Sequence, residues 1–487
     1  MINTRILPSE GMVVGAKRFS EGALGSLSHV NPATGTEQGR IPIADEVQVD
    51  AAVKAAWAAF PAWRDLPASH RRDLLNRLAD LLRSEGETMA SIGVLDNGTP
   101  ISVTRNGCSV LPSDWFRYYA GWIDKIEGRT IPIYPGNLFD YTKLIPFGVV
   151  GLLTAFNGPM AFIGFKVAPA LAAGNTVVLK PSELAPWTSI RFAELCLEAG
   201  IPPGVVNVIT GDGRTGQALA SHRGIRKISF TGSGATASRV MAAASANLIP
   251  FTAELGGKSA VILFADGNPS QTVPLVTRMV LSLLSGQVCL AGTRLFVERS
   301  VYAKSVEQAV EIARTIKIGD PRDDATQMGP VISAFHADRI LKFVAAARDR
   351  GDGKLVLAGE RLGGSLAGGS FVSPSIFSDV DPTSPLGQEE IFGPVLSILP
   401  FDTEEEAVRL ANATRFGLGG YVFTADVRRA HRVADALEAG FISVNTYGMC
   451  PPGAPFGGVK GSGFGREGGW DGLREMLTTK NVQMSLN

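Results

Sequence analysis

The sequence has few of the residues that mark a disulfide-stabilised or metal-binding protein. Its 487 residues include only four cysteines and five histidines. Cys108, Cys196, Cys289 and Cys450 form no CxxC pair, and no two histidines have the spacing of an HExxH motif. This argues against a disulfide framework, predicts no bound metal, and favours a reducing, cytoplasmic setting.

An excess of charge of one sign is also absent. Lys+Arg and Asp+Glu each total 46, so the sequence lacks the basic excess typical of nucleic-acid-binding proteins. One uncharged run, 144–165, is long enough to span a membrane. Prolines and glycines divide it into a strand at 149–154, a loop and the start of a helix. We therefore expect neither a nucleic-acid partner nor a membrane span.

Short apolar runs and helix-like stretches alternate along most of the chain. Strand-like runs lie at 149–154, 175–180, 205–210 and 226–232, and a second alternating series extends from about 259 to 445. Strands that alternate with helices predict βαβ units and parallel sheets, hence an α/β fold. At this length we expect two or three domains.

Two amphipathic helices are predicted outside the strand runs. Leu74, Leu78 and Leu81 lie on one helical face, with Ser69 as the predicted N-cap, and a second helix is predicted over 305–318.

Two segments alternate apolar and polar residues in the manner of exposed strands. Residues 130–145 predict a hairpin that turns at Pro135-Gly136-Asn137, and the tail 479–487 places Val482, Met484 and Leu486 on one face. An isolated hairpin is only marginally stable, so these strands need a partner. The pattern alone leaves open whether that partner is another chain or the same one.

Several motifs have the composition of a nucleotide site, and each is ambiguous alone. Gly232-x-Gly234-x-x-Ala237 follows a strand and opens a helix, as a dinucleotide fingerprint does. On that interpretation Glu254 would be the ribose-binding acid. Lys180, Ser182 and Glu183 follow another strand and could hold ribose hydroxyls or form a solvated turn.

Cys289 lies among small residues in the segment "SGQVCLAGTRL". Most cysteines are small hydrophobic residues of a core, but small neighbours also leave a thiolate nucleophile accessible to a substrate. The segment alone does not distinguish these two roles.

Seven motifs in a fixed order resolve the ambiguity. They are Asn157 after a strand, "GNTVVLKPSE", "FTGS", "ELGGKSA", "GQVCLAGTR", "EEIFGPV" and "PFGGVKGSGFGRE". In this order the chain resembles the aldehyde dehydrogenase superfamily from about Val30 to the C-terminus.

The resemblance implies a set of catalytic roles. Cys289 would attack an aldehyde to form a thiohemiacetal, and Asn157 with the Cys289 backbone N–H would stabilise its oxyanion. Glu254, in the family's "ELGGK" motif, would be the general base rather than a ribose ligand. Lys166 and Glu467 match a proton-relay pair.

The resemblance also implies how NAD is held, with NADP as a possible replacement. Lys180, Ser182 and Glu183 match contacts to the adenosine ribose. Gly232 and Ser233 match pyrophosphate contacts, and Glu390 and Phe392 match the nicotinamide-ribose side.

The implied fold is that of an aldehyde dehydrogenase. A Rossmann-type coenzyme domain would comprise 1–124 and 146–256, and an α/β catalytic domain 257–461. A small β oligomerisation element and the tail would comprise 125–145 and 462–487. This makes pairing between subunits the expected role of the hairpin and tail, in a homodimer or homotetramer.

The chain departs from the family where an aldehyde would enter. Gly158 stands where an aromatic residue is often found, and by position the tunnel would be lined by Gly158, Phe162, Phe165, Cys450 and Phe456. This predicts a wide, apolar tunnel for bulky or aromatic aldehydes. The competing interpretation is that Gly158 only relieves crowding by Phe162.

Two alternatives remain within the fold. One is a coenzyme-A-acylating semialdehyde dehydrogenase, against which Glu254 argues because transfer to a thiol needs no such base. The other is a catalytically silent binding protein, against which the set of Cys289, Asn157 and Glu254 argues. Were Cys289 not the nucleophile, Cys450 would be the next candidate, and we expect Cys450 to be the more exposed of the two.

Overall fold

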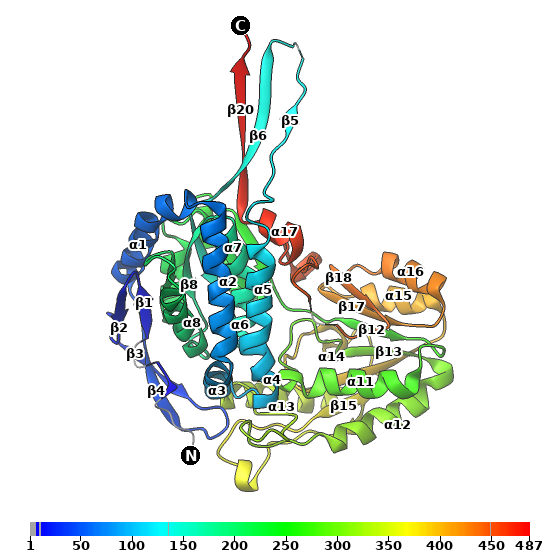
Figure 1. Ribbon diagram of the computed structural model, residues 1–487. Coiled ribbons are helices and arrows are strands. Elements are labelled where there is room, and N and C mark those ends of the chain that lie inside the picture. Colours follow the sequence, from blue (N-terminus) through cyan, green and yellow to red (C-terminus); the bar gives the residue numbers. More distant parts are fainter. Residues whose placement is uncertain (1–5, 9–10, 135, 449) are drawn as a thin grey trace.

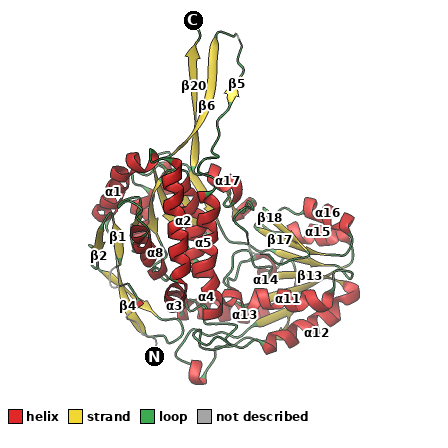
Figure 2. Cartoon of the chain, in the orientation of Figure 1, coloured by secondary structure: helices red, strands yellow, loops and turns green. Residues whose placement is uncertain are grey.

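The structure is a computed structural model that describes residues 6–8, 11–134, 136–448 and 450–487. It shows two α/β bodies side by side, and a narrow β-sheet that projects from the first of them (Figures 1 and 2). Pro135, the first residue of the predicted hairpin turn, lies outside the described residues.

The first body is built on an eight-stranded sheet. Strands β7, β8, β9, β10 and β11 run parallel and are almost wholly buried, as expected for a sheet covered on both faces. The strand order is β19 (Gly463–Phe464), β11 (Phe251–Glu254), β10 (Lys227–Thr231), β7 (Val149–Leu153), β8 (Thr176–Lys180), β9 (Val206–Val208), β1 (Met12–Val14), β2 (Lys17–Phe19).

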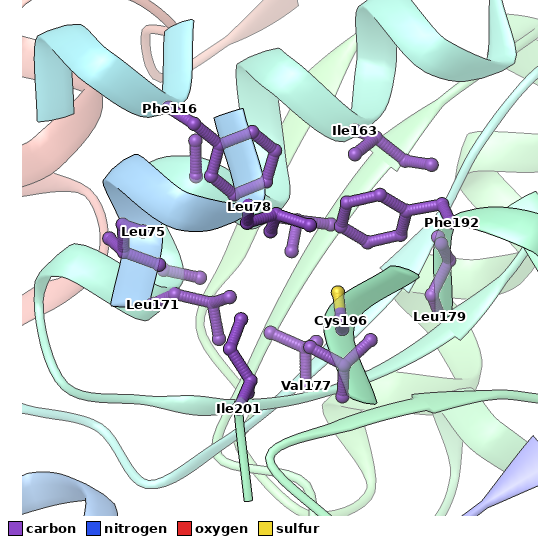
Figure 3. Packing of buried hydrophobic residues seen from close by; sticks show 14 of the residues in the cluster. Leu75, Leu78, Phe116, Ile163, Leu171, Val177, Leu179, Phe192, Cys196 and Ile201 are labelled. Atoms are coloured by element: carbon purple, nitrogen blue, oxygen red, sulfur yellow. The ribbon is translucent and has the colours of Figure 1, made fainter. Parts of the chain in front are cut away.

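Helices pack on both faces of this sheet. On one face lie α2 (Ala68–Ser84), α3 (Gly86–Asn97), α5 (Leu111–Ala120), α7 (Ala168–Ala172) and α8 (Trp187–Glu198). On the other lie α1 (Glu46–Arg64), α9 (Gly213–Ala220) and α10 (Gly234–Ser245). Figure 3 shows the first of these cores, a cluster that includes Leu78, Phe116 and Phe192 from the helices and Val177 from β8. Cys196 lies in this core as an ordinary buried side chain.

Two predicted helix boundaries were wrong. Helix α2 begins at Ala68 with Pro67 as its N-cap residue, so Ser69 lies inside the first turn and does not cap the helix. The helix expected over 305–318 is α12, and it runs from Arg299 to Thr315. In both cases the helix begins earlier because the preceding residues adopt helical geometry without a side-chain cap.

The second body is built on a seven-stranded sheet, parallel except at its β14 edge. The strand order is β14 (Lys354–Leu357), β15 (Ser375–Ser378), β16 (Val395–Phe401), β13 (Arg294–Glu298), β12 (Ala260–Leu263), β17 (Gly419–Phe423), β18 (Phe441–Val444). Helices α11 (Pro269–Leu281) and α12 (Arg299–Thr315) cover one face. The other is covered by α13 (Ala334–Arg350), α15 (Glu404–Asn412) and α16 (Val427–Ala436).

The projecting sheet joins the hairpin and the tail. Its order is β20 (Leu477–Ser485), β6 (Leu138–Pro146), β5 (Thr130–Ile131), and all nine residues of β20 pair with β6. Within the described chain β20 has a neighbour on one side only, so its outer edge is open. The same C-terminal segment also contributes β19 to the first sheet.

Short elements complete the chain, and several of them surround the site. They are β3 (Ser26–Val30), β4 (Glu37–Pro42), α4 (Ile101–Arg105), η2 (Asn106–Val110), α6 (Pro159–Phe162), η3 (Ile163–Val167), η4 (Leu283–Gly286), η5 (Gly364–Leu366), α14 (Pro385–Gln388), η6 (Lys460–Ser462) and α17 (Gly469–Arg474).

The prolines and glycines of the uncharged run at 144–165 divide it into short elements, as predicted. It forms the end of β6, then β7, a loop, α6 and the start of η3. Over the described residues, no helix combines the length and the apolar character needed to cross a bilayer.

Candidate active site

Cys289 lies in a tightly held loop between the two bodies. The chain enters this loop through Leu284, Ser285 and Gly286, which all have positive φ. The Ser285 hydroxyl donates to the Gly329 carbonyl at 2.8 Å. On the far side of the loop, a Cβ on Gly257 would lie 2.6 Å from the Cys289 carbonyl oxygen. The small residues around Cys289 in the sequence therefore allow close backbone packing, and Cys289 itself is half-buried.

Asn157 links this loop to the end of β7. Its Nδ2 donates to the Gln287 carbonyl at 2.8 Å, and its side chain is buried. The preceding residue, Phe156, is fixed in turn because its carbonyl accepts from Asn97 Nδ2 at 3.1 Å. The amide of Asn157 is thus held beside the cysteine loop.

Glu254 is a buried carboxylate at the end of β11. It is 2% exposed, and neither of its oxygens has a hydrogen-bond partner among the described residues. Burial, and after it the nearby charge of Glu467, raise the pKa of Glu254 to about 8. Burial and the adjacent Glu254 together hold the pKa of the Cys289 thiol well above its usual range. Near neutral pH the pair is therefore a neutral thiol beside a carboxyl group that is mostly protonated, and the carboxylate that can accept a proton predominates only above about pH 8.

Lys166 and Glu467 form a buried ion pair behind Glu254. Lys166 Nζ contacts Glu467 Oε1 and donates to Ser229 Oγ at 2.9 Å, and the two side chains are 0% and 5% exposed. The second oxygen, Glu467 Oε2, is buried without a partner in the described structure.

Two cavities meet at Cys289 and share Asn157 and Phe162 in their walls. The first, of about 320 Å³, lies on the side of α10 and is lined by Gly232, Ser233, Glu254, Glu390 and Phe392 among others. The second, of about 140 Å³, lies on the opposite side of the cysteine. A reactant in one cavity and a second reactant in the other would therefore meet at the thiol.

The second cavity is apolar and contains all five residues predicted for the substrate tunnel. They are Gly158, Phe162, Phe165, Cys450 and Phe456. Its described lining includes no Lys, Arg, Asp or Glu. A Cβ on Gly158 would lie 3.9 Å from the Phe162 ring, an ordinary contact, so glycine is not needed there to relieve crowding.

The expected exposure of Cys450 was wrong. Cys450 is 8% exposed and packs against Leu418 and Phe456, whereas Cys289 is the more accessible thiol. Cys108, from η2, also lines the second cavity, so three of the four cysteines border one space.

The first cavity has features that fit a dinucleotide. It reaches the N-terminus of the 12-residue helix α10, where Ser233 Oγ accepts from the Thr236 N–H at 3.3 Å and a Cβ on Gly234 would meet nothing within 4 Å. An open helix N-terminus with glycines is suited to a pyrophosphate. The buried, unpartnered Thr231 Oγ1 lies at the same cavity.

Glu390 and Phe392 close the opposite wall of the first cavity. Glu390 Oε1 accepts from the Gly257 N–H at 3.0 Å, and a Cβ on Gly256 would lie 2.0 Å from Glu390 Oε2. Phe392, with φ of 57°, packs edge-on against Phe156 at 5.8 Å.

Lys180, Ser182 and Glu183 lie apart from both cavities, at the carboxyl end of β8. Lys180 is buried, and its Nζ is 3.6 Å from Glu183 Oε2. The Glu183 side chain is 39% exposed, so its carboxylate is accessible from solvent. A ligand would have to extend from α10 to β8 to reach these residues as well as Cys289.

Sequence reasoning missed His336 and Arg339 of α13 in the first cavity. His336 Nε2 is 2.7 Å from the Phe392 carbonyl oxygen, and burial lowers the pKa of His336 to about 4. Arg339 contacts the Ile391 carbonyl. It also missed Asn97, Thr104 and Cys108 in the second cavity. None of these residues lies in a motif, so only the packing of distant segments could reveal them.

Comparison with known proteins gives one consistent result. A sequence model of the aldehyde dehydrogenase family matches residues 19–482. PnpE from Pseudomonas sp. WBC-3 is 39% identical over 98% of both chains, with a TM-score of 0.95. Betaine aldehyde dehydrogenase from Staphylococcus aureus, solved in complex with NAD+, is 32% identical over 99% of this chain and 96% of that one, also at 0.95. HpcC from Thermus thermophilus is 36% identical over 99% and 95%, again at 0.95.

Proposed function

The chain belongs to the aldehyde dehydrogenase family and is an NAD(P)-dependent enzyme, and on that premise we propose that it oxidises an aldehyde to a carboxylic acid through a covalent intermediate on Cys289. The observation that supports this most directly is the meeting of the two cavities at that thiol. Each reactant reaches the sulfur from its own side.

In the proposed reaction, Cys289 sulfur bonds to the aldehyde carbon while Glu254 takes the thiol proton. Asn157 Nδ2 and the Cys289 backbone N–H stabilise the oxyanion, and a donor of this kind contributes about 3 kcal/mol to the transition state. A bound nicotinamide coenzyme would supply the hydride acceptor, so that loss of hydride from that carbon would leave a thioester on Cys289. Once Glu254 has released the thiol proton to solvent, it removes a proton from the water that hydrolyses the thioester.

We propose NAD as the preferred coenzyme. Ser233 and the N-terminus of α10 would hold the pyrophosphate, Lys180, Ser182 and Glu183 the adenosine ribose, and Glu390 the second ribose. The Glu183 carboxylate accepts hydrogen bonds from ribose hydroxyls and repels a 2′-phosphate. The S. aureus neighbour was solved with NAD+, as was PnpE.

For the substrate we propose a bulky apolar or aromatic aldehyde. The 140 Å³ cavity has no charged residue in its described lining, so nothing there would pair with a carboxylate of the substrate. Phe162, Phe165 and Phe456 supply apolar walls, and the absence of a side chain at Gly158 leaves space beside the sulfur.

For the whole chain we propose the domain division expected from the sequence and a homodimer or homotetramer formed through the projecting sheet. The coenzyme domain corresponds to the body with the eight-stranded sheet, and the catalytic domain to the body that carries Cys289.

Formation of reduced coenzyme from a panel of aldehydes, with and without coenzyme A, tests the proposal. We expect turnover with NAD that needs no coenzyme A and releases a carboxylic acid. Strict dependence on coenzyme A would indicate the acylating alternative, and no turnover with any aldehyde would indicate a silent protein.

A further inference from the structure

A band of polar side chains crosses the buried interior from the site toward the surface. It lies on one face of β10 and β11, where Ser229 pairs with Thr252 and Thr231 pairs with Glu254 in parallel register. Registered partners in a parallel pair point to the same face, and side chains alternate along each strand. We call this set the polar band: Lys227, Ser229 and Thr231 on β10, and Thr252 and Glu254 on β11.

The polar band is unusual because its members are 1% to 5% exposed. The opposite face of the same strands has Ile228, Phe230 and Ala253 in an apolar core. Covered faces of parallel sheets are normally apolar, since buried polar groups cost free energy unless they are paired. A polar stripe in this place therefore calls for a functional explanation.

Each end of the polar band has a charged group beside it. At the site end, Lys166 donates to Ser229 and pairs with Glu467. At the far end, Glu475 Oε2 accepts from Lys227 Nζ and from Thr252 Oγ1, both at 2.9 Å. Glu475 directly follows α17, which lies at the base of the projecting sheet (Figure 1). Its side chain is 31% exposed.

The site end also contains buried polar atoms without partners in the described structure. They are Thr231 Oγ1, both carboxylate oxygens of Glu254 and Glu467 Oε2. Buried polar atoms in folded proteins are almost always satisfied, by ordered water where no protein group is available. We therefore expect water molecules to bridge these oxygens.

We propose that the polar band conducts protons from Glu254 to Glu475 and so to solvent. This rests on the proposed function, in which Glu254 is the base. During hydrolysis the oxygen of water bonds to the thioester carbon and the carbon–sulfur bond breaks. One proton of that water returns to the Cys289 sulfur and the other passes to Glu254, while the product leaves as a carboxylate. Glu254 must therefore lose the thiol proton before hydrolysis and this second proton before the next turnover.

The route extends beyond the Lys166–Glu467 pair that the family resemblance suggests. From that pair the proposed path leads to Ser229 through its hydrogen bond with Lys166. It continues to Thr252, the registered strand partner of Ser229, and to the Glu475 carboxylate through the hydrogen bond from Thr252. Lys227 holds Glu475 in place through the hydrogen bond from its Nζ. The competing exit is the first cavity, which Glu254 also lines.

Single-turnover stopped flow in weak buffer tests the route, with a pH indicator reporting proton release and absorbance reporting reduced coenzyme. We expect Glu475→Gln and Thr252→Val to keep hydride transfer near the wild-type rate. Release of the hydrolytic proton should slow about fivefold or more, with a larger solvent isotope effect. Glu475→Asp, which restores a carboxylate, should recover most of the rate.

Arg474→Gln is the matched control. Arg474 hydrogen-bonds to the Leu477 carbonyl and Thr479 Oγ1 on the same segment but not to the polar band, so proton release should be unchanged. Equal slowing in Arg474→Gln, or normal release in both Glu475→Gln and Thr252→Val, would overturn the proposal. If the wild-type enzyme transferred no hydride, that result would contradict the proposed function and therefore also the proton relay that depends on it.

Discussion

Burial of Glu254 sets the pH range in which it can act as a base. Because the pKa of Glu254 is raised to about 8, the carboxyl group is mostly protonated below that pH. A protonated carboxyl cannot accept the proton of the hydrolytic water. We expect kcat to rise with pH and level off above about 8 where hydrolysis limits turnover.

Glu254→Gln should remove the rise of kcat with pH and leave a burst of reduced coenzyme followed by slow turnover.

The burial of Glu254 also affects the stability of the fold. The raised pKa means that the folded state binds the proton more tightly than the unfolded state, so ionisation of Glu254 destabilises the fold as pH rises from about 4.5 to 8. The Tm of Glu254→Gln should therefore exceed that of wild type most clearly above pH 8. An unchanged pH profile in this variant would contradict the assignment.

Cys289 and Cys450 border the same cavity, so each serves as a control for the other. Cys289→Ala should abolish aldehyde oxidation and leave coenzyme binding measurable by fluorescence. Cys450→Ala should keep turnover, because it changes only the cavity wall. Loss of turnover in Cys450→Ala together with activity in Cys289→Ala would reverse the assignment.

At the scale of single elements, the turn after β8 is expected to decide between coenzymes. Glu183→Gln removes the charge that opposes a 2′-phosphate and keeps the shape of the side chain. We expect kcat/KM for NADP to rise relative to NAD, by roughly tenfold if about 1.4 kcal/mol of repulsion is relieved. Steady-state kinetics with both coenzymes measure this ratio. A wild-type enzyme that prefers NADP would contradict the proposed role of Glu183.

The loop between β7 and α6 is expected to set substrate size. An added Cβ at Gly158 would lie 3.5 Å from Ala161 and 3.9 Å from Phe162, so alanine fits there and a larger side chain must use cavity space. We expect Gly158→Phe to lower kcat/KM for benzaldehyde-type and long branched aldehydes while sparing acetaldehyde. The loss should be about 1–3 kcal/mol, with Gly158→Ala intermediate. A wild-type preference for acetaldehyde would disprove the wide tunnel.

Element boundaries show where local patterns were sufficient. Buried strands such as β7 and β8 were predicted to within a residue, because short runs rich in Val and Leu, bounded by turn residues, are typical of a covered strand. Ser69 was misassigned as a cap because the choice among neighbouring start residues depends on packing that a local pattern does not contain.

At the scale of the whole molecule, the projecting sheet bears on the assembly. Its strands expose Leu138, Phe139 and Met484, and Leu486 beyond β20 is 66% exposed. An open edge beside exposed apolar residues is typical of a surface that pairs with another chain. We expect a dimer or tetramer in solution.

Met484→Lys with Leu486→Lys should shift the assembly toward smaller species in analytical ultracentrifugation. Phe335→Lys is the matched control, because Phe335 is 79% exposed on α13, away from this sheet. A monomeric wild type, or an equal shift in the control, would argue against assembly through the sheet.

The sequence by itself determined the class of fold, the order of its strands and helices, and the identity of the motif residues from Asn157 to Glu467. These follow from local periodicity and from motifs whose residues lie close together in the chain. Only the tertiary structure decided which of them meet. Cys289 and Asn157 are brought together by a hydrogen bond that spans 130 residues, and Glu254 acquires its raised pKa from burial and from Glu467. His336, Cys108 and the polar band emerge in the same way, because burial and proximity are properties of packed segments rather than of any stretch of sequence.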